Sequence, residues 1–234
     1  HAYKMKENGA DIIDIGGEST KPNANYVDDF EESKRILKII KKLSYDNFLI
    51  SADTRKPSVM TQAIDNGARI INDISGMSDP LTPKIIAKSG ASIVIMHIKG
   101  SPKNMQINPK YKFAPIEIYN FLEKKIELAL SEGIKLNRIA IDPGFGFGKS
   151  PLHNMQIMAW LPMFQSLGVP VLLGASRKSS IAALSNNELP KDRLAGSIAL
   201  LCYANLFGTQ IIRVHDVMET SQAINICSNV NKQL

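Results

Sequence analysis

The chain has 234 residues, of which 44% are apolar and 21% are charged. This composition is typical of a globular protein and excludes a wholly disordered chain. No apolar run approaches the ~18 residues that a membrane-spanning helix needs. Lysine and arginine outnumber aspartate and glutamate by 28 to 22, and the net charge of +6 favours an anionic partner without identifying it.

The two cysteines and the start of the chain bear on its setting and completeness. Cys202 and Cys227 lie in apolar, helix-like segments without a pairing pattern, so we predict buried thiols rather than a disulfide, in a cytoplasmic protein. The chain begins at His1 in what resembles the second half of a helix. We therefore expect a strand to precede it that the sequence does not contain.

One pattern recurs along the chain: a polar helical segment ends at glycine, and a short apolar run follows. Glycine is favoured just past a helix because it adopts positive φ without a Cβ clash. The runs are rich in Ile, Val and Leu, which is typical of parallel strands buried on both faces. In chain order, the predicted strands lie at 10–17, 47–54, 68–75, 91–97, 139–144, 169–176 and 209–216.

Alternating strands and helix-sized segments predict a parallel sheet with crossover helices. A closed barrel of eight βα units needs ~250 residues. We predict a single domain, residues 1–234, with the α/β fold of a (β/α)8 TIM barrel whose first strand is absent from the sequence. An open, doubly wound sheet is the alternative.

Every predicted strand ends in polar residues, and three of the seven endings also contain glycine. The endings read GGEST, ADTR, NDIS, MHIKG, DPGFGFGK, ASRKS and RVHD. One polar residue at such a point is often a helix cap. Seven polar endings at the carboxyl edge of a barrel instead predict a shared catalytic face.

Three segments have simpler interpretations. Residues 31–42 have the alternating charges of a solvent-exposed helix face rather than of a nucleic-acid site. Residues 99–115 have no regular period, and a loop of that length in a compact barrel is often functional, for instance as a lid. The C-terminal helix, about 218–230, is expected to pack on the barrel or on a partner subunit.

Several apparent motifs fail. The segment 144–150 resembles a phosphate-binding loop, but Pro143 holds the position of an essential glycine. Lys178 lies beside Arg177, which would lower its pKa as in a Schiff-base lysine. Its position at a helix N-terminus suits binding of an anion or a carbonyl oxygen, which we favour. No histidine or cysteine pair has zinc-site spacing, so a transition-metal site is not expected.

Polar residues at strand ends predict two neighbouring subsites. Asp53, Asn72 and Asp142 end three strands and would present hydrogen-bonding groups to the amidine-like edge of a heterocycle. Leaving such groups unpaired is costly, which would make the pocket selective. Arg213 and His215 are two apart on the last strand, point the same way and make an anion clamp suited to phosphate.

Together these segments closely resemble dihydropteroate synthase, the pterin-binding barrel of folate biosynthesis. The similar segments cover nearly the whole chain in the family's order: DIIDIGGEST (11–20), ISADTRK (50–56), INDISG (71–76), VIMHIKGSPKNMQ (94–106), DPGFGFGK (142–149), GASRKS (174–179) and RVHDVMET (213–220). The resemblance implies a transferase that joins 6-hydroxymethyl-7,8-dihydropterin diphosphate to p-aminobenzoate, releases pyrophosphate and uses Mg²⁺. It also implies a homodimer, with no nucleic acid or membrane partner.

The resemblance also assigns residues by motif. Asp53 and Lys178 would be catalytic, Arg213 and His215 would bind the diphosphate, and Met96 would pack on the pterin ring. The pterin-binding set would be Asp53, Asn72, Met96, Asp142 and Lys178. The p-aminobenzoate set would be Thr20, Lys21, Pro22, Phe147, Lys178 and Ser179.

Two departures from the family pattern matter. The family's metal-contacting Asn lies in the absent first strand, so no metal ligand is expected within this chain. Lys21 stands where the family usually has Arg, and lysine keeps the charge but loses bidentate geometry. Two alternatives stay open: a methyltetrahydrofolate-dependent methyltransferase of the same barrel family, and a non-catalytic pterin-binding fragment.

Overall fold

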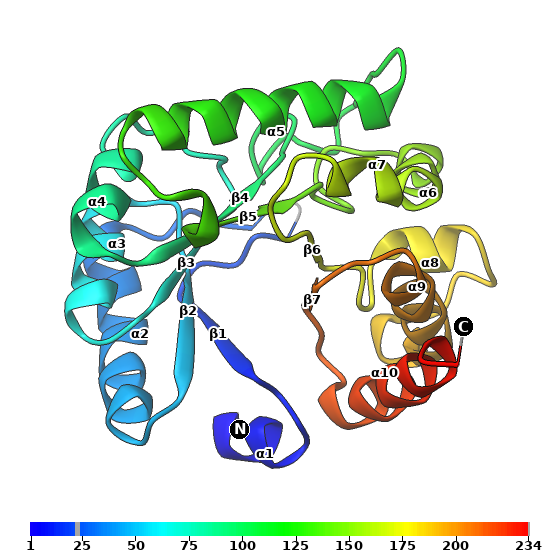
Figure 1. Cartoon of the computed structure of the whole chain (residues 1–234), viewed down its shortest axis with the longest axis horizontal. Helices are drawn as coiled ribbons and strands as arrows, with labels where there is room; N and C mark the ends of the chain where they lie inside the picture. Colours follow the sequence, from blue (N-terminus) through cyan, green and yellow to red (C-terminus); the bar gives the residue numbers. More distant parts are fainter. Residues whose placement is uncertain (22–23, 234) are drawn as a thin grey trace.

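The computed structural model describes residues 1–21 and 24–233 (Figure 1). Seven parallel strands follow one another in chain order: β1 (Ile12–Gly16), β2 (Leu49–Asp53), β3 (Ile70–Asp73), β4 (Ser92–Met96), β5 (Ile139–Asp142), β6 (Leu172–Leu173) and β7 (Ile211–Ile212). Strands β1 to β5 form one sheet, β6 pairs with β7, and a bridge between Ile141 and Val171 joins the two groups. This order confirms the predicted α/β fold of the TIM-barrel type.

Helices separate the strands and cover their outer face (Figure 1). They are α1 (Ala2–Glu7), α2 (Asp29–Tyr45), α3 (Pro57–Asp65), α4 (Thr82–Ser89), α5 (Ala114–Ser131), α6 (Pro151–Ala159), α7 (Leu161–Gln165), α8 (Ser179–Ala183), α9 (Leu194–Leu206) and α10 (Val217–Asn231). Short 3-10 turns lie at Leu136–Arg138 and Pro190–Asp192. Within the part of the chain that is described, no helix is long and apolar enough to cross a membrane.

Strands β2 to β6 are mostly buried, whereas β1 and β7 are largely half-buried. Side chains such as Ile50, Ile71, Ile93 and Ile95 are wholly buried in the main core. Burial of each aliphatic side chain of this size contributes about 1.5–3 kcal/mol. The strands therefore form a rigid base for the polar residues at their ends.

Strand register aligns these polar ends. Gly16 on β1 pairs with Asp53 on β2, which in turn pairs with Asn72 on β3. Met96 on β4 pairs with Asp142 on β5. Asn72 pairs with Val94, so the Met96–Asp142 pair lies two residues further toward the carboxyl ends of the strands than Asp53 and Asn72. The sequence positions predicted to carry the chemistry therefore gather at the carboxyl edge of the sheet, in two neighbouring rows.

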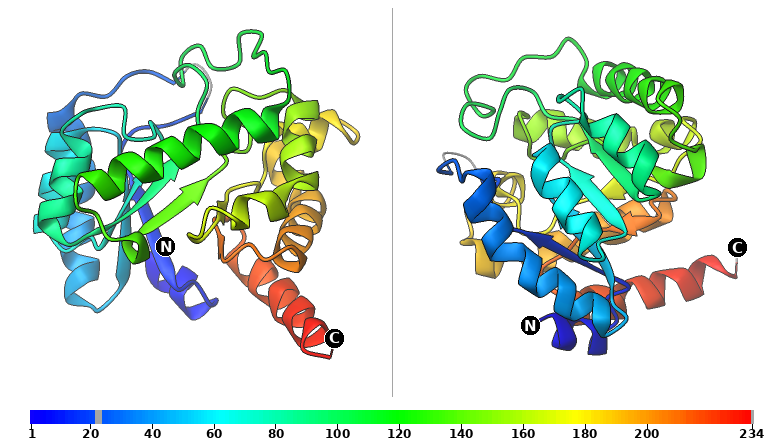
Figure 2. Two further views of the ribbon diagram at one scale, coloured as in Figure 1. Left: turned by 45° about the horizontal axis from the view of Figure 1, so that its top comes forward. Right: turned by 90° about the vertical axis from the view of Figure 1, so that its left-hand side faces the viewer.

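The long segments after β1 and β4 lie on the same side of the molecule (Figure 2). The segment after β4 is attached to the glycine-rich loop at two points. Gln106 Nε2 donates to the carbonyl oxygen of Gly146 at 2.7 Å, and the Tyr111 hydroxyl donates to that of Gly148 at 3.0 Å. The predicted loop thus packs over the carboxyl ends of the strands.

The last two helices correct one prediction. Helix α10 packs on α9 and extends away from the sheet (Figure 2). Cys202 on α9 and Cys227 on α10 are free thiols, as predicted, but both are partly exposed rather than buried. Thr220 is the one buried residue among the described residues of α10, because this helix packs on its neighbour and not in the core.

Candidate active site

An arginine after β7 is bound to carboxylates on β1 and β2. Arg213 Nε donates to Asp14 Oδ2 at 2.6 Å, and its Nη2 donates to Asp53 Oδ2 at 2.9 Å. Asn72 Nδ2 donates to the same Asp14 oxygen at 3.3 Å. The structure therefore brings together the predicted residues Asp53, Asn72 and Arg213, and adds Asp14, which the sequence analysis missed.

This cluster keeps oxygen atoms available for a ligand. Asp14 Oδ1 and Asn72 Oδ1 are buried without a hydrogen-bond partner. Buried polar atoms are almost always paired, and an unpaired one indicates a site that another group completes. The cluster can therefore accept hydrogen bonds or coordinate a cation.

The carboxyl group of Asp53 is strongly perturbed. Its burial and the negative charge of Asp14 raise its pKa to about 7, against the opposing effect of Arg213. Perturbed carboxyl groups of this kind are characteristic of functional sites. Asp53 can therefore change protonation state near neutral pH.

A second buried carboxyl group lies at the end of β5. Asp142 Oδ1 accepts a hydrogen bond from the Gly144 amide at 2.7 Å, which fixes the orientation of the side chain. Burial raises its pKa above the ordinary value. Met96 lies opposite Asp142 on β4 and packs in a small apolar cluster with Ile74 and Phe147. A carboxyl group beside an apolar wall suits a flat, polar-edged ring.

Lys178 lies close to this wall. Its Nζ is 4.1 Å from the centroid of the Phe147 ring, within the range of a cation–π interaction. Burial and nearby Arg213 lower the pKa of Lys178 to about 8, although Asp142 and Asp53 favour its charged form. The ammonium group is therefore partly desolvated beside the predicted pocket.

The glycine-rich loop 144–148 is folded around a lysine that the sequence analysis did not assign. Lys149 is 2% exposed, donates to the carbonyl oxygens of Gly144 at 2.8 Å and Phe147 at 2.9 Å, and lies 3.0 Å from His97 Nδ1. Gly144 has φ of 71°, and a Cβ there would lie 1.9 Å from the His97 carbonyl oxygen. Gly144 and Lys149 therefore both shape the loop that carries Phe147.

The other residues predicted to form the site lie outside the Arg213 cluster and the Asp142 pocket. His215 Nδ1 lies 3.1 Å from the Ser176 hydroxyl, so the loop that follows β6 orients the His215 ring. Thr20 is half-buried and Lys21 is exposed on the segment after β1, and Ser179 is exposed at the start of α8. Pro22 lies outside the described residues. Among residues 1–21 and 24–233, no group of three or more His, Cys, Asp or Glu side chains is arranged to hold a metal ion.

Known proteins are similar to this chain in both sequence and fold. A family model described as pterin binding enzyme matches residues 1–215. Dihydropteroate synthase from Escherichia coli strain K12 is 40% identical over 227 residues, which cover 97% of this chain and 80% of that protein.

Solved structures of similar proteins agree with this match. The dihydropteroate synthase of Yersinia pestis, solved in complex with a sulfonamide drug, has a TM-score of 0.96 at 40% identity and aligns over 99% of this chain and 84% of that one. The Xanthomonas albilineans dihydropteroate synthase with 4-aminobenzoic acid has a TM-score of 0.94 at 41% identity, over 99% of this chain and 83% of that one.

Proposed function

Because the chain belongs to the pterin-binding enzyme family, we infer that it is a transferase with dihydropteroate synthase activity. It condenses 6-hydroxymethyl-7,8-dihydropterin diphosphate with p-aminobenzoate, and it forms 7,8-dihydropteroate and pyrophosphate. The observation that carries this function is the joint presence of a buried carboxyl group beside an apolar wall and an arginine-containing cluster at the neighbouring strand ends. These features suit the pterin ring and its diphosphate, respectively.

The first subsite would bind the pterin. Asp142 would accept hydrogen bonds from the amino-pyrimidine edge, and Asn72 and Asp53 would complete the polar rim. Met96 would pack against the ring, and Lys178 would donate to its carbonyl oxygen or ring nitrogen. The second subsite would hold the diphosphate through Arg213 and His215, with Arg suited to bidentate recognition of phosphate.

The chemical step would be cleavage of the C–O bond between the pterin methylene group and the diphosphate. The electron pair leaves with pyrophosphate, and the positive charge remains on the pterin methylene carbon. The ionised carboxylate of Asp53 would stabilise that charge electrostatically. The amine of p-aminobenzoate then attacks the carbon and loses a proton. Thr20, Lys21, Phe147 and Ser179 would hold the amine substrate, as would Pro22, and Lys178 would lie between the two substrates.

Mg²⁺ is the proposed cofactor, and Asp14 fits it, although the sequence analysis expected no metal ligand within this chain. The unpartnered, buried Asp14 Oδ1 is a hard oxygen ligand of the type that Mg²⁺ prefers. A single carboxylate is sufficient because Mg²⁺ commonly takes its other ligands from substrate phosphates and water. When bound, the ion would neutralise charge on the departing pyrophosphate.

We further propose a cytoplasmic homodimer. Support comes from the exposed side chains of Met218, Ile226 and Val230 on α10, an apolar face that a second subunit could cover. Light scattering of the purified chain would give the mass of the dimer, and the mass of one chain would contradict this proposal.

Incubation of the chain with pterin diphosphate and labelled p-aminobenzoate tests the function. The label is expected in dihydropteroate, with equimolar pyrophosphate. Pterin binding without turnover would instead support a non-catalytic pterin-binding protein. Methyl transfer from methyltetrahydrofolate to a corrinoid protein would support the related methyltransferase, although a diphosphate site has no use in that reaction.

A further inference from the structure

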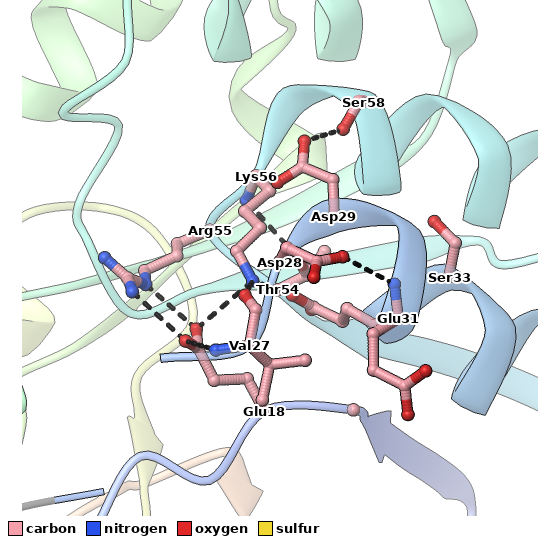
Figure 3. Close-up of polar contacts among 12 residues, drawn as sticks. Glu18, Val27, Asp28, Asp29, Glu31, Ser33, Thr54, Arg55, Lys56 and Ser58 are labelled. Carbon is pink, nitrogen blue, oxygen red and sulfur yellow. Dashed lines mark hydrogen bonds and ion pairs between the residues drawn. The ribbon is translucent and has the colours of Figure 1, made fainter. Parts of the chain in front are cut away.

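The segment 18–27 follows β1, and its residues 18–21 and 24–27 are described. The carboxylate of Glu18 connects its two ends. Glu18 accepts hydrogen bonds from Arg55 Nε at 3.1 Å and from Arg55 Nη2 at 3.3 Å (Figure 3). Its Oε1 also accepts from the Val27 amide at 3.1 Å. Glu18 begins the segment and Val27 ends it, so this side chain joins both ends.

A buried lysine forms the second connection. Lys56 Nζ donates to the carbonyl oxygen of Val27 and to the Glu32 carboxylate, and it lies 3.6 Å from Glu18 Oε2. Lys56 is 6% exposed and Glu32 is 1% exposed. Removal of one partner of a buried ion pair strongly destabilises the folded protein, because the other charge is left buried without compensation. Lys56 and Glu32 therefore anchor the end of the segment to α2 and α3.

Glu18 is held in its ionised form. Burial alone would raise its pKa, but hydrogen bonds from Arg55 and the Val27 amide outweigh burial, and the net effect is a lowered pKa. The carboxylate therefore accepts all three hydrogen bonds at neutral pH. Bidentate, charge-assisted pairs of this kind are stronger and more directional than neutral hydrogen bonds.

The closed segment lines a cavity of about 380 Å³ near the carboxyl ends of β1, β2 and β4. Its lining includes Glu18, Tyr26, Arg55, Ser101 and Lys103. The same segment carries Thr20 and Lys21, which we assign to the amine substrate. Both residues follow Glu18 closely in the chain, so the position of Glu18 determines how they are presented to that substrate.

We propose that Glu18, Arg55 and Lys56 form a clasp that fixes the two ends of this segment for substrate binding, so that Glu18 is a positioning residue for the aromatic amine. The inference rests on the proposed function, since it needs Thr20 and Lys21 to face p-aminobenzoate. A preorganised loop loses less conformational entropy when the ligand binds. The clasp thus contributes to amine affinity without contacting the amine.

Steady-state kinetics of Glu18→Gln test the clasp. The KM for p-aminobenzoate is expected to rise about tenfold, equivalent to ~1.4 kcal/mol. The kcat and the KM for pterin diphosphate should stay within about twofold, because uniform binding energy affects KM alone. Glu31→Gln is the matched control, since Glu31 also pairs with an arginine, Arg35, at 3.0 Å, but on the exposed face of α2. It should leave all three constants unchanged.

Arg55→Lys supplies a second test. Lysine keeps the charge but loses the planar fork that contacts both oxygens of Glu18. The KM for p-aminobenzoate should rise in the same direction, and the double variant with Glu18→Gln should be no worse than the more impaired single variant. Additive effects would show that the two residues act separately and would overturn the clasp.

Hydrogen exchange separates this proposal from the proposed function. The Val27 amide should exchange faster in Glu18→Gln than in the wild type and in Glu31→Gln, without any substrate present. Equal losses in the binding of both substrates, or kinetics like those of Glu31→Gln, would overturn the clasp. A wild type without synthase activity would refute the proposed function. An unchanged exchange rate of the Val27 amide in Glu18→Gln would refute the clasp, whether or not the wild type is active.

Discussion

Replacement of Asp142 with asparagine should separate pterin affinity from stability. Asp142 is buried, and burial raises its pKa, so the ionised carboxylate has a free-energy cost in the folded protein without pterin. When folding raises the pKa of a carboxyl group, that group stabilises the fold fully at pH values below its pKa in the unfolded chain. This contribution is lost as the pH rises through its pKa in the folded protein. At pH 7 a neutral asparagine therefore costs the fold nothing, and its Oδ1 can still accept from the Gly144 amide.

The loss of pterin affinity follows from the hydrogen bonds that disappear. A hydrogen bond to a charged group contributes ~1.5–3 kcal/mol. Removal of one such interaction should weaken pterin binding roughly 10- to 150-fold. Isothermal titration calorimetry measures the Kd, and thermal unfolding in the absence of ligand should show a Tm equal to or above that of the wild type.

Asp73→Asn is the matched control for this substitution. Asp73 is also a buried carboxyl group at a strand end, but its oxygens accept from the Ser75 amide at 2.8 Å, the Ser75 hydroxyl at 2.6 Å and the Met77 amide at 2.8 Å. An amide side chain cannot satisfy all of these donors, so the Tm should fall while pterin affinity stays unchanged. If Asp142→Asn instead lost stability and retained pterin affinity, the assignment of the pterin pocket would be refuted.

Three further predictions concern the same site. The kcat/KM for pterin diphosphate should rise as Asp53 ionises near pH 7 and fall as Lys178 loses its proton near pH 8, and a profile flat from pH 6 to 9 would contradict these roles. Lys21→Arg should lower the KM for p-aminobenzoate or pterin diphosphate severalfold, since arginine adds bidentate geometry, and unchanged KM values would dismiss this idea. Gly144→Ala should lower the Tm and abolish pterin binding, because its Cβ would lie 1.9 Å from the His97 carbonyl oxygen. A Tm and a pterin Kd equal to those of the wild type would show that the loop is not constrained at Gly144.

The sequence pattern predicted the strands well where local residues determine them. The run at 47–54 contains β2, and that at 91–97 contains β4, because continuous aliphatic residues need burial on both faces. The last two strands are shorter than predicted. Gln210 explains part of this, since its side-chain oxygen accepts from the Val171 amide at 2.8 Å in place of a backbone partner. A side chain that replaces a backbone partner in a strand ladder leaves no periodic pattern in the sequence.

The candidate site was also predictable only where local sequence determines it. Asp53, Asn72 and Asp142 could be found because polar residues at strand ends share one edge of the sheet. The contact of Arg213 with Asp14 joins residues at opposite ends of the chain, and no local pattern indicates such a pair. Lys149 was missed because its partners are mostly backbone carbonyl oxygens, which any sequence supplies. The glycines of the segment 144–150, which resembles a phosphate-binding loop, instead lie where the backbone has positive φ.

Pyrophosphate release by three proteins in one assay tests the central claim most directly. With pterin diphosphate and p-aminobenzoate both present, the wild type should release pyrophosphate and form equimolar dihydropteroate. At a pterin diphosphate concentration well below its KM, Asp73→Asn should match the wild type once corrected for folded protein, and Asp142→Asn should be slower by the factor of its weakened pterin binding. No release by the wild type, or equal rates in Asp142→Asn and the wild type, would contradict the account.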